Sequence, residues 1–407
     1  MTTVTWPSEF PGAHWLDQQE EDAVLDVLRN GSLFRYYGLK PPKAVDGYEA
    51  AARAYYGAKY ALGINSGTGA LVTAMQALGV GPGDEVIVPA FLWVATVGAV
   101  VACNAIPVIC EVDASFNLDP RDLERKITPR TKLVVPIHMA GSPCDMDAIM
   151  AVAQKHRLAV LEDCAQCNGG EYRGQKVGTF GDIGIFSLQL NKNMTCGEGG
   201  LLITQDERLY HRIFSAHDMG MVRVNGRLAM PGADALAWGG GRRMAELCGA
   251  VAGVQLAKLP MILGKMRASH RRLRDALAGT PNLTLRQLHD AAGDTGPFLI
   301  FSLDTADRAV AAVKKIREAG IASAFRLADY GLHIYSNIPS LVQKVPLSPA
   351  GNPWSLAENA ASLRDYAAGA CPASDALFAR SILVPVPSNL TADQEAAAAA
   401  IIRAAAA

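Results

Sequence analysis

Short apolar runs alternate with helix-length segments over much of the chain. Between residues 61 and 206 the runs are ALGIN, EVIVP, PVICEV, KLVVPIH, LAVLEDC, DIGIFSL and GLLIT. Several are apolar at consecutive positions, which is typical of strands covered on both faces. Strands separated by helices indicate an α/β domain with a mostly parallel, seven-stranded sheet and right-handed crossovers. Residues just after each run are candidate site residues, because such sheets bind ligands at the carboxyl ends of their strands.

The flanking regions show helical patterns. DQQEEDAVLDVLRN is an amphipathic helix ended by Gly31, and a second helix is predicted from Arg243 to about Gly279. After it, GPFLIFSL, DRAVAAVKKIREAG and SILVPVPS indicate a smaller α+β domain. The tail has a capping box at Thr391–Gln394 and is expected to be a helix that frays at its end. We therefore predict a large domain over residues 1–260 and a small C-terminal domain over 261–407.

One apolar segment is long enough to cross a bilayer. The 25 residues between Glu85 and Glu111 carry no charge, and about 20 apolar residues suffice for a span. Pro89 and Pro107 divide the segment into a β-branched run, a small-residue helix and a second β-branched run. The pattern favours a buried strand–helix–strand unit.

Composition narrows the function classes. The 407 residues are 50% hydrophobic and carry a net charge of −1, without basic or acidic blocks. This balance argues against disorder and indicates no nucleic-acid or membrane partner. The opening MTTVTWPSEFPG lacks the features of a signal peptide, so the eight cysteines are expected to be reduced thiols of a cytoplasmic protein. CAQC has no second CxxC, so we predict no metal site.

Four features lie at predicted strand ends. NSGTGAL, with Ser66, Gly67 and Thr68, is either a structural turn or an anion cradle at a helix start. Asp163 in LEDCAQ is either a helix cap or the partner of a buried cation. Trp93 in PAFLW is either a core aromatic or a ring that stacks on a flat ligand. The fourth feature, FSLQLNKNMTCGEGG, contains Ser187 and the isolated Lys192.

These features together match one cofactor. A lysine in a desolvated pocket is a usable nucleophile for Schiff-base formation. Pyridoxal phosphate (PLP) requires such a lysine, an anion site for its phosphate and a carboxylate that keeps its pyridine nitrogen protonated. The strand ends supply all three groups.

The chain resembles the DegT/DnrJ/EryC1/StrS sugar aminotransferases, which are fold type I PLP enzymes. The resemblance rests on NSGTGAL, GDEVIVPAFLWVAT, ITPRTKLVVPIHMAG, EDCAQCNGG, GTFGDIGIFS and KNMTCGEGG. It implies that Lys192 forms the Schiff base and that Asp163 pairs with the pyridinium. It also implies that Gln166 lies near the phenolic oxygen and that Trp93 stacks on the ring. The phosphate is then held by Ser66, Gly67, Thr68 and Ser187.

The resemblance further implies a homodimer with shared active sites, and here the sequence departs from the family. Gly241 stands where the family usually has an asparagine that reaches the partner's phosphate, and Arg242 or Arg243 is a candidate replacement. GSLFRYYG and the loop around His333 look closer to the branch that aminates Kdo-type ulosonic acids. Arg35 is then either a contact for an acidic substrate or a structural surface arginine, and His333 is a candidate substrate residue. His138 and His217 are expected to be structural.

The expected reaction is transfer of an amino group from glutamate or glutamine to a keto-sugar, ulosonic acid or cyclitol. The alternatives are a PLP-dependent sugar dehydratase and a PLP-binding regulator. Lys192 argues against a dehydratase, because those relatives carry histidine at this position. The balanced charge argues against a DNA-binding regulator.

Overall fold

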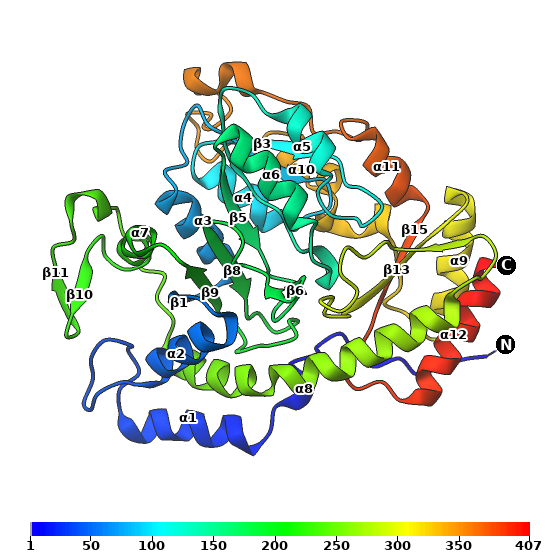
Figure 1. Ribbon diagram of the computed structural model, residues 1–407, viewed down its shortest axis with the longest axis horizontal. Coiled ribbons are helices and arrows are strands. Elements are labelled where there is room, and N and C mark those ends of the chain that lie inside the picture. Colours follow the sequence, from blue (N-terminus) through cyan, green and yellow to red (C-terminus); the bar gives the residue numbers. More distant parts are fainter. Residues whose placement is uncertain (1) are drawn as a thin grey trace.

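Seven strands form the central sheet of the computed structural model, which describes residues 2–407. Their order is β1-β9-β8-β5-β4-β2-β3 (Figure 1). The strands are β1 (Tyr60–Ile64), β2 (Glu85–Pro89), β3 (Ile106–Cys110), β4 (Thr131–Val134), β5 (Ala159–Asp163), β8 (Ile183–Ser187) and β9 (Gly200–Thr204). Pairs from β3 to β8 are parallel, whereas β9 is antiparallel to both β8 and β1. The predicted α/β fold with a mostly parallel sheet is confirmed.

Helices connect most of these strands, namely α3 (Gly67–Ala77), α4 (Val94–Ala102), α5 (Pro120–Lys126) and α6 (Met146–His156). Helices α1 (Gln18–Asn30) and α2 (Ala44–Tyr56) precede β1, and α7 (Glu207–His217) follows β9. Two hairpins lie outside the sheet, β6 (Glu171–Tyr172) with β7 (Gln175–Lys176), and β10 (Val222–Val224) with β11 (Arg227–Ala229). The uncharged segment forms β2, α4 and β3, as its pattern predicts, and α1 ends at Gly31 with φ of 71°.

Alternating side chains of the sheet pack into different clusters. Val86 and Val88 of β2 belong to the core that α3, α4 and α7 cover, whereas Ile87 belongs to the core beneath α5 and α6. A strand presents successive side chains to opposite faces, so the three central residues of β2 must all be apolar. All five of its residues are buried. This explains why apolar residues occupy consecutive positions in the strand sequences rather than alternating with polar ones.

The C-terminal part has its own small sheet, in the order β12-β13-β15-β14. Its strands are β12 (Leu283–Leu285), β13 (Phe298–Leu303), β14 (Phe325–Arg326) and β15 (Ser381–Pro385), all paired antiparallel. The accompanying helices are α9 (Ala306–Glu318), α10 (Pro339–Val342), α11 (Pro372–Ala379) and α12 (Ala392–Ala406). The predicted strand–helix–strand pattern of this region is therefore present.

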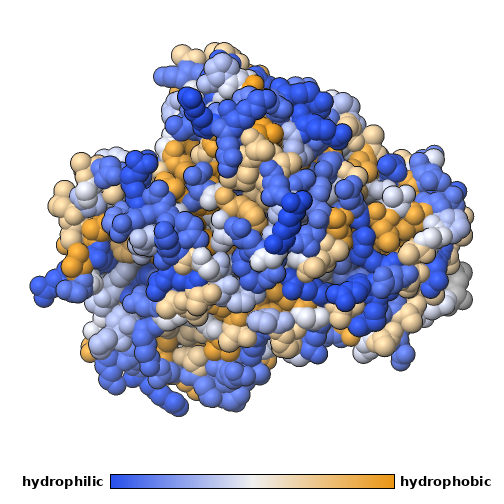
Figure 2. All heavy atoms as spheres, in the orientation of Figure 1, coloured by the Kyte–Doolittle hydropathy of each residue, from blue (hydrophilic) through white to orange (hydrophobic). Residues whose placement is uncertain are grey.

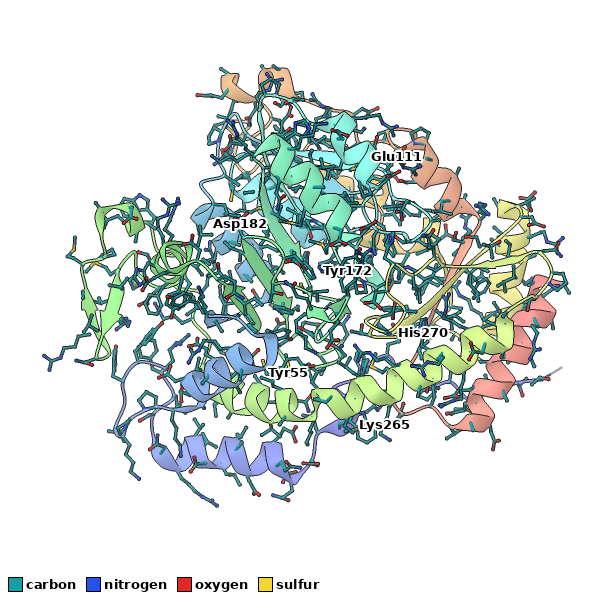
Figure 3. The ribbon with its side chains drawn as sticks, in the orientation of Figure 1. Tyr55, Glu111, Tyr172, Asp182, Lys265 and His270 are labelled. Carbon is teal, nitrogen blue, oxygen red and sulfur yellow. The ribbon has the colours of Figure 1, made fainter. Side chains whose placement is uncertain are left out.

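The long helix α8 (Glu246–Leu277) runs along one side of the molecule and joins both parts (Figure 1). By length and composition it is the one helix of the described chain that is apolar enough to cross a membrane. It packs instead against α1, α2 and α12. Figure 3 shows His270 and Lys265 on opposite faces of α8, with His270 buried and Lys265 exposed. The boundary predicted at residue 260 falls inside this helix.

The two ends of the chain pack on the small four-stranded sheet and its helices. Ile401, Ile402 and Ala405 of α12 are buried in its core, and Val4 and Trp6 pack against the same cluster. The expectation that the tail frays is therefore wrong, because its last turns contribute to the core. The capping box at Thr391–Gln394 is present as predicted.

Candidate active site

A cavity of about 390 Å³ opens at the carboxyl ends of the central strands. Every residue that the sequence assigns to the cofactor lines it, namely Ser66, Gly67, Thr68, Trp93, Asp163, Gln166, Ser187 and Lys192. These residues follow β1, β2, β5 and β8. The topology brings them together because the carboxyl ends of parallel strands share one edge of the sheet.

Lys192 lies in the loop after β8, where its backbone N–H donates to the Gln189 carbonyl O (2.9 Å). Burial lowers the pKa of its ammonium, and the nearby carboxylate of Asp163 partly opposes that shift. Desolvation destabilises the charged form of an amine. The side chain is therefore closer to a neutral nucleophile than a surface lysine would be.

Asp163 is the last residue of β5 and is buried. Burial raises the pKa of its carboxyl group, against hydrogen bonds from Ala165 and Thr96 and the charge of Lys192. Its Oδ1 accepts from the Ala165 N–H (3.0 Å), and its Oδ2 accepts from Thr96 Oγ1 (3.0 Å). The carboxylate thus caps a turn and faces a cation, which combines the two alternatives that the sequence left open. Thr96 was missed, although it is the one hydroxyl residue of the apolar α4.

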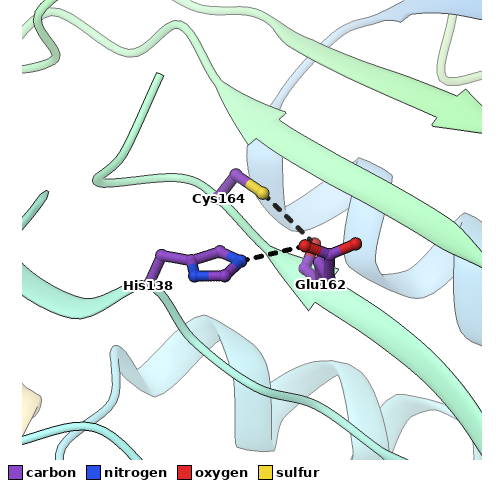
Figure 4. Close-up of side chains that lie close together, drawn as sticks. All are labelled: His138, Glu162 and Cys164. Atoms are coloured by element: carbon purple, nitrogen blue, oxygen red, sulfur yellow. Dashed lines mark hydrogen bonds and ion pairs between the residues drawn. The ribbon is translucent and has the colours of Figure 1, made fainter. Parts of the chain in front are cut away.

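Behind Asp163 lies a buried cluster of His138, Glu162 and Cys164 (Figure 4). His138 Nδ1 accepts from the Cys144 N–H (3.1 Å), so Nε2 carries the proton and donates to Glu162 Oε2 (3.1 Å). The Glu162 carboxylate also accepts from three backbone N–H groups, those of Gly178, Phe180 and Gly181. These bonds occupy both oxygens of the Glu162 carboxylate. The cluster therefore orders the loop beside β5 that carries Gly178, Phe180 and Gly181, and this is consistent with the structural role expected for His138.

The N-terminus of α3 faces the cavity. Ser66 caps the helix through the Gly69 N–H, which donates to Ser66 Oγ (2.9 Å). The N–H groups of Gly67 and Thr68 belong to the first turn, which has no intrahelical acceptors. A Cβ on Gly67 would lie 2.8 Å from the Cβ of Ser187, so only glycine lets the two segments approach this closely. Amides, hydroxyls and the helix dipole together form an anion cradle.

Trp93, His333 and Gln166 form another wall of the cavity, and Tyr330 packs behind His333. The ring centroids of Trp93 and His333 are 4.6 Å apart, and those of His333 and Tyr330 are 4.2 Å apart and nearly parallel. Burial and the charge of Lys192 lower the pKa of His333 to about 4. Gln166 Oε1 accepts from the Ala140 N–H (3.0 Å), and Gln166 Nε2 donates to the neutral His333 Nε2 (3.3 Å). Trp93 is 43% exposed, so it is a cavity wall and not a core aromatic.

Arg35 does not line this cavity. Its side chain is buried, with Nη2 donating to Glu49 Oε1 (2.7 Å) and Nη1 donating to the Gly63 carbonyl O (3.1 Å). The Gly63 N–H donates to the same Glu49 oxygen (2.7 Å). The prediction that Arg35 contacts substrate, and the alternative of a surface arginine, are both corrected, because this guanidinium neutralises a buried carboxylate.

The two arginines beside Gly241 are also engaged within the chain. Arg243 Nη1 donates to Asp218 Oδ1 (2.7 Å), and Arg242 Nη1 donates to Thr73 Oγ1 (3.2 Å) and Gln76 Oε1 (3.0 Å). His217 is buried, and its Nε2 lies 3.0 Å from the Tyr36 hydroxyl, consistent with a structural role. Replacement of the family's asparagine by Arg242 or Arg243 stays a prediction.

The donor set fits pyridoxal phosphate. The cradle at α3 suits a phosphate, Asp163 suits a pyridinium, Lys192 suits an aldehyde carbon, and Trp93 and His333 offer flat faces. Tyr330 was missed by the sequence analysis, because it comes from an irregular C-terminal loop without a motif.

Known proteins share this fold and these motifs. The chain is 38% identical over 300 residues to L-glutamine:2-deoxy-scyllo-inosose aminotransferase of Streptomyces fradiae, covering 71% of this chain and 68% of that protein. It is 42% identical over 210 residues to GDP-perosamine synthase of Caulobacter vibrioides, covering 51% of this chain and 54% of that protein. The chain thus spans about half the length of some curated relatives.

A solved structure of 3-amino-5-hydroxybenzoic acid synthase superposes with a TM-score of 0.79 at 28% identity and covers 99% of this chain and 98% of that one. Residues 15–336 match the DegT/DnrJ/EryC1/StrS aminotransferase family. This match extends over most of the chain and includes every cavity residue described above. The chain therefore belongs to the DegT/DnrJ/EryC1/StrS aminotransferase family.

Proposed function

We propose that this protein is a PLP-dependent aminotransferase that moves an amino group from glutamine or glutamate to a keto-sugar or cyclitol. The observation that carries the proposal is the placement of Lys192 and Asp163 in one cavity that the N-terminus of α3 also enters. Family membership and relatives named as aminotransferases support it. The reduced thiols expected from the sequence are consistent with a cytoplasmic enzyme.

Each of these cavity residues has its own chemical role in the proposed reaction. When bound, PLP supplies an electron sink that takes up the electrons of a substrate Cα–H bond. Lys192 Nζ would hold the cofactor covalently and, when free, would accept and return the proton of the substrate Cα. The Asp163 carboxylate would keep the pyridine nitrogen protonated. Gln166, held by the Ala140 N–H, would serve the phenolic oxygen, and the α3 cradle with Ser187 would hold the phosphate.

The acceptor is proposed to be a neutral polyhydroxylated ketone. Relatives are named for a cyclitol and for a GDP-linked sugar. GSLFRYYG and the loop around His333 favoured an ulosonic acid, but Arg35, the expected contact for its carboxylate, is bound to Glu49. Apart from Lys192, no lysine or arginine of residues 2–407 lines the cavity, so this chain offers an acidic acceptor little electrostatic attraction.

We also propose that the enzyme acts as a homodimer with shared active sites. Large apolar side chains are exposed on the loop before α2 and on the segment around β10 and β11, including Leu39, Met230 and Trp238. Figure 2 shows hydrophobic atoms gathered at the left edge, over this hairpin. Apolar patches of this kind mark interaction sites. Gly241 and its neighbours come directly after this segment in the sequence. Their position supports the proposal that this part of the chain contributes to a partner's active site.

The first experiment tests the role of Lys192. Purified protein loaded with PLP should show the visible absorbance of the lysine-bound cofactor, and Lys192→Ala should abolish that band. Lys59→Ala, at an exposed position, is the matched control and should keep it. Adding glutamine or glutamate to the wild type should convert the band to that of pyridoxamine phosphate. An unchanged spectrum in Lys192→Ala would disprove the assignment.

A further inference from the structure

A second, smaller cavity of about 60 Å³ adjoins the first on the side of the small domain. The two cavities share Gln166, Asn191, Lys192 and His333. The rest of its wall comes from Asn193, from Tyr330, from the N-terminal arm, from the start of β13 and from the end of β15 with the residues after it. A substrate that reacts at Lys192 therefore has this cavity as a neighbour.

One acidic side chain, Glu9, lines the smaller cavity among the described residues. Burial raises the pKa of its carboxyl group, and the Ser323 hydroxyl, which donates to it, opposes the shift. Among residues 2–407, no lysine, arginine or histidine contributes to that pKa. A half-buried carboxylate that forms no ion pair with these residues retains acceptor capacity for a ligand.

The backbone that carries Glu9 is fixed on both sides. The Val4 N–H donates to the Ala319 carbonyl O (2.9 Å), and Trp6 Nε1 donates to the Pro385 carbonyl O (3.1 Å). After Glu9, the Gly12 N–H donates to the carbonyl O of Lys192 itself (3.1 Å). The arm therefore holds the carboxylate in a defined position relative to the reacting lysine.

Much of the remaining wall is apolar. Phe298, Tyr330, Pro385 and Pro387 contribute to it, and the Tyr330 ring is stacked on His333. The polar side chains of Asn191 and Asn193 line the cavity as well. A largely apolar wall with one carboxylate suits a ring that has C–H faces and hydroxyl groups at its edge, because the apolar residues cover the C–H face and the carboxylate accepts from O–H groups.

We propose that Glu9 is a specificity-determining residue that accepts a hydrogen bond from a hydroxyl group of the acceptor ring. This inference rests on the proposed function and assigns Glu9 to the acceptor half-reaction. The amino donor carries a carboxylate, which Glu9 repels at close range, so the donor gains nothing from it. The same repulsion selects against acidic acceptors and in favour of neutral polyhydroxylated ketones.

The test compares the two half-reactions in Glu9→Gln and Glu9→Ala. Conversion of the PLP form by glutamine should be no slower than in the wild type. Reaction of the pyridoxamine form with scyllo-inosose, a polyhydroxylated cyclohexanone, or with a GDP-linked keto-hexose should require about tenfold or more acceptor, with KM changing more than kcat. Unsubstituted cyclohexanone should react equally with all forms. Glu21→Gln, on the exposed face of α1, is the matched control.

Other results would contradict different parts of the proposal. Unchanged acceptor kinetics in both Glu9 variants, or a parallel loss in the donor half-reaction, would overturn the assignment of Glu9 while leaving the proposed function intact. A wild type that reacts with neither polyhydroxylated ketone would overturn the assigned acceptor class. A wild type that no amino donor converts would overturn the proposed function itself. An unaltered visible spectrum of the PLP-loaded variants checks that the cofactor site is intact.

Discussion

Burial sets the protonation of the ionisable groups around the cavity. It lowers the pKa of Lys192, lowers that of His333 to about 4 and raises that of Asp163. Each shift disfavours the charged form, as expected for desolvation. Near neutral pH, His333 is therefore an uncharged acceptor for Gln166 and adds no positive charge beside Lys192.

His217 provides a pH test of the fold. Burial lowers its pKa to about 3, from an ordinary value of 6.5. Between these values the unfolded chain binds a proton that the folded chain does not, so stability is fully present above pH 6.5 and falls as the pH drops. Lowering the pH from 7 to 5 should cost about 1–2 kcal/mol from this residue.

Urea unfolding of wild type and His217→Gln at both pH values measures this contribution. The variant should lose less stability on acidification than the wild type. His211→Gln, at an exposed position of α7, should behave as the wild type does. Equal pH dependence in all three proteins would contradict the prediction.

Cys248 is predicted to be the most reactive thiol. A hydrogen bond from the Cys196 thiol lowers the pKa of Cys248 to about 7, and its side chain is only partly buried. Burial raises the pKa of Cys110, Cys144 and Cys164. Because the thiolate is the nucleophile, iodoacetamide at pH 8 should alkylate Cys248 first, as measured by peptide mass spectrometry. Cys196→Ser should alter that rate, whereas first labelling of a buried cysteine would refute the idea.

At the scale of elements, α8 does more than connect two domains. Its first residue, Glu246, accepts from the N–H groups of Lys43, Ala44 and Val45 at 2.9, 2.7 and 3.1 Å. These are the orphan donors at the start of α2, whose N-cap residue Lys43 forms no side-chain cap. A single buried carboxylate therefore joins two helices that are far apart in sequence.

Removing this contact should be costly. Glu246→Ala leaves three N–H groups without an acceptor and should lower the free energy of unfolding by about 2–3 kcal/mol. Thermal unfolding followed by circular dichroism would show the lower Tm. Glu207→Ala, which removes an exposed first-turn glutamate of α7, is the control and should change Tm little. A similar Tm for both variants would be inconsistent with this capping role.

At the scale of the whole molecule, several large apolar side chains are exposed on the surface that the proposed dimer would cover. Trp238 is 97% exposed, Leu39 is 89% exposed and Met230 is 70% exposed. If they pack between two copies of the chain, Trp238→Asp combined with Met230→Asp should shift the molecular mass from dimer to monomer and reduce activity. Light scattering coupled to size exclusion measures the mass. Leu363→Asp, which replaces a leucine of the region after α10, should remain dimeric.

Much of the central architecture followed from local pattern. Continuous apolar runs predicted the strands because both faces of the sheet are covered, and the strand-end rule located Ser66, Asp163 and Lys192. The reversed direction of β9 did not follow, since a buried strand has the same composition in either direction. The fraying predicted for α12 failed because the burial of Ile401 and Ile402 depends on β13 and β15.

The sequence by itself determined which residues carry usable chemistry and at which strand ends they lie, because these depend on residue type and short spacing. Only the tertiary structure decided which charged groups are paired. It placed Glu49 beside Arg35 and Glu246 at the start of α2, and it left Glu9 at the cavity wall without an ion pair among residues 2–407. Ion pairs and hydrogen bonds form between neighbours in space, and for these residues the neighbours lie up to 203 positions apart in sequence.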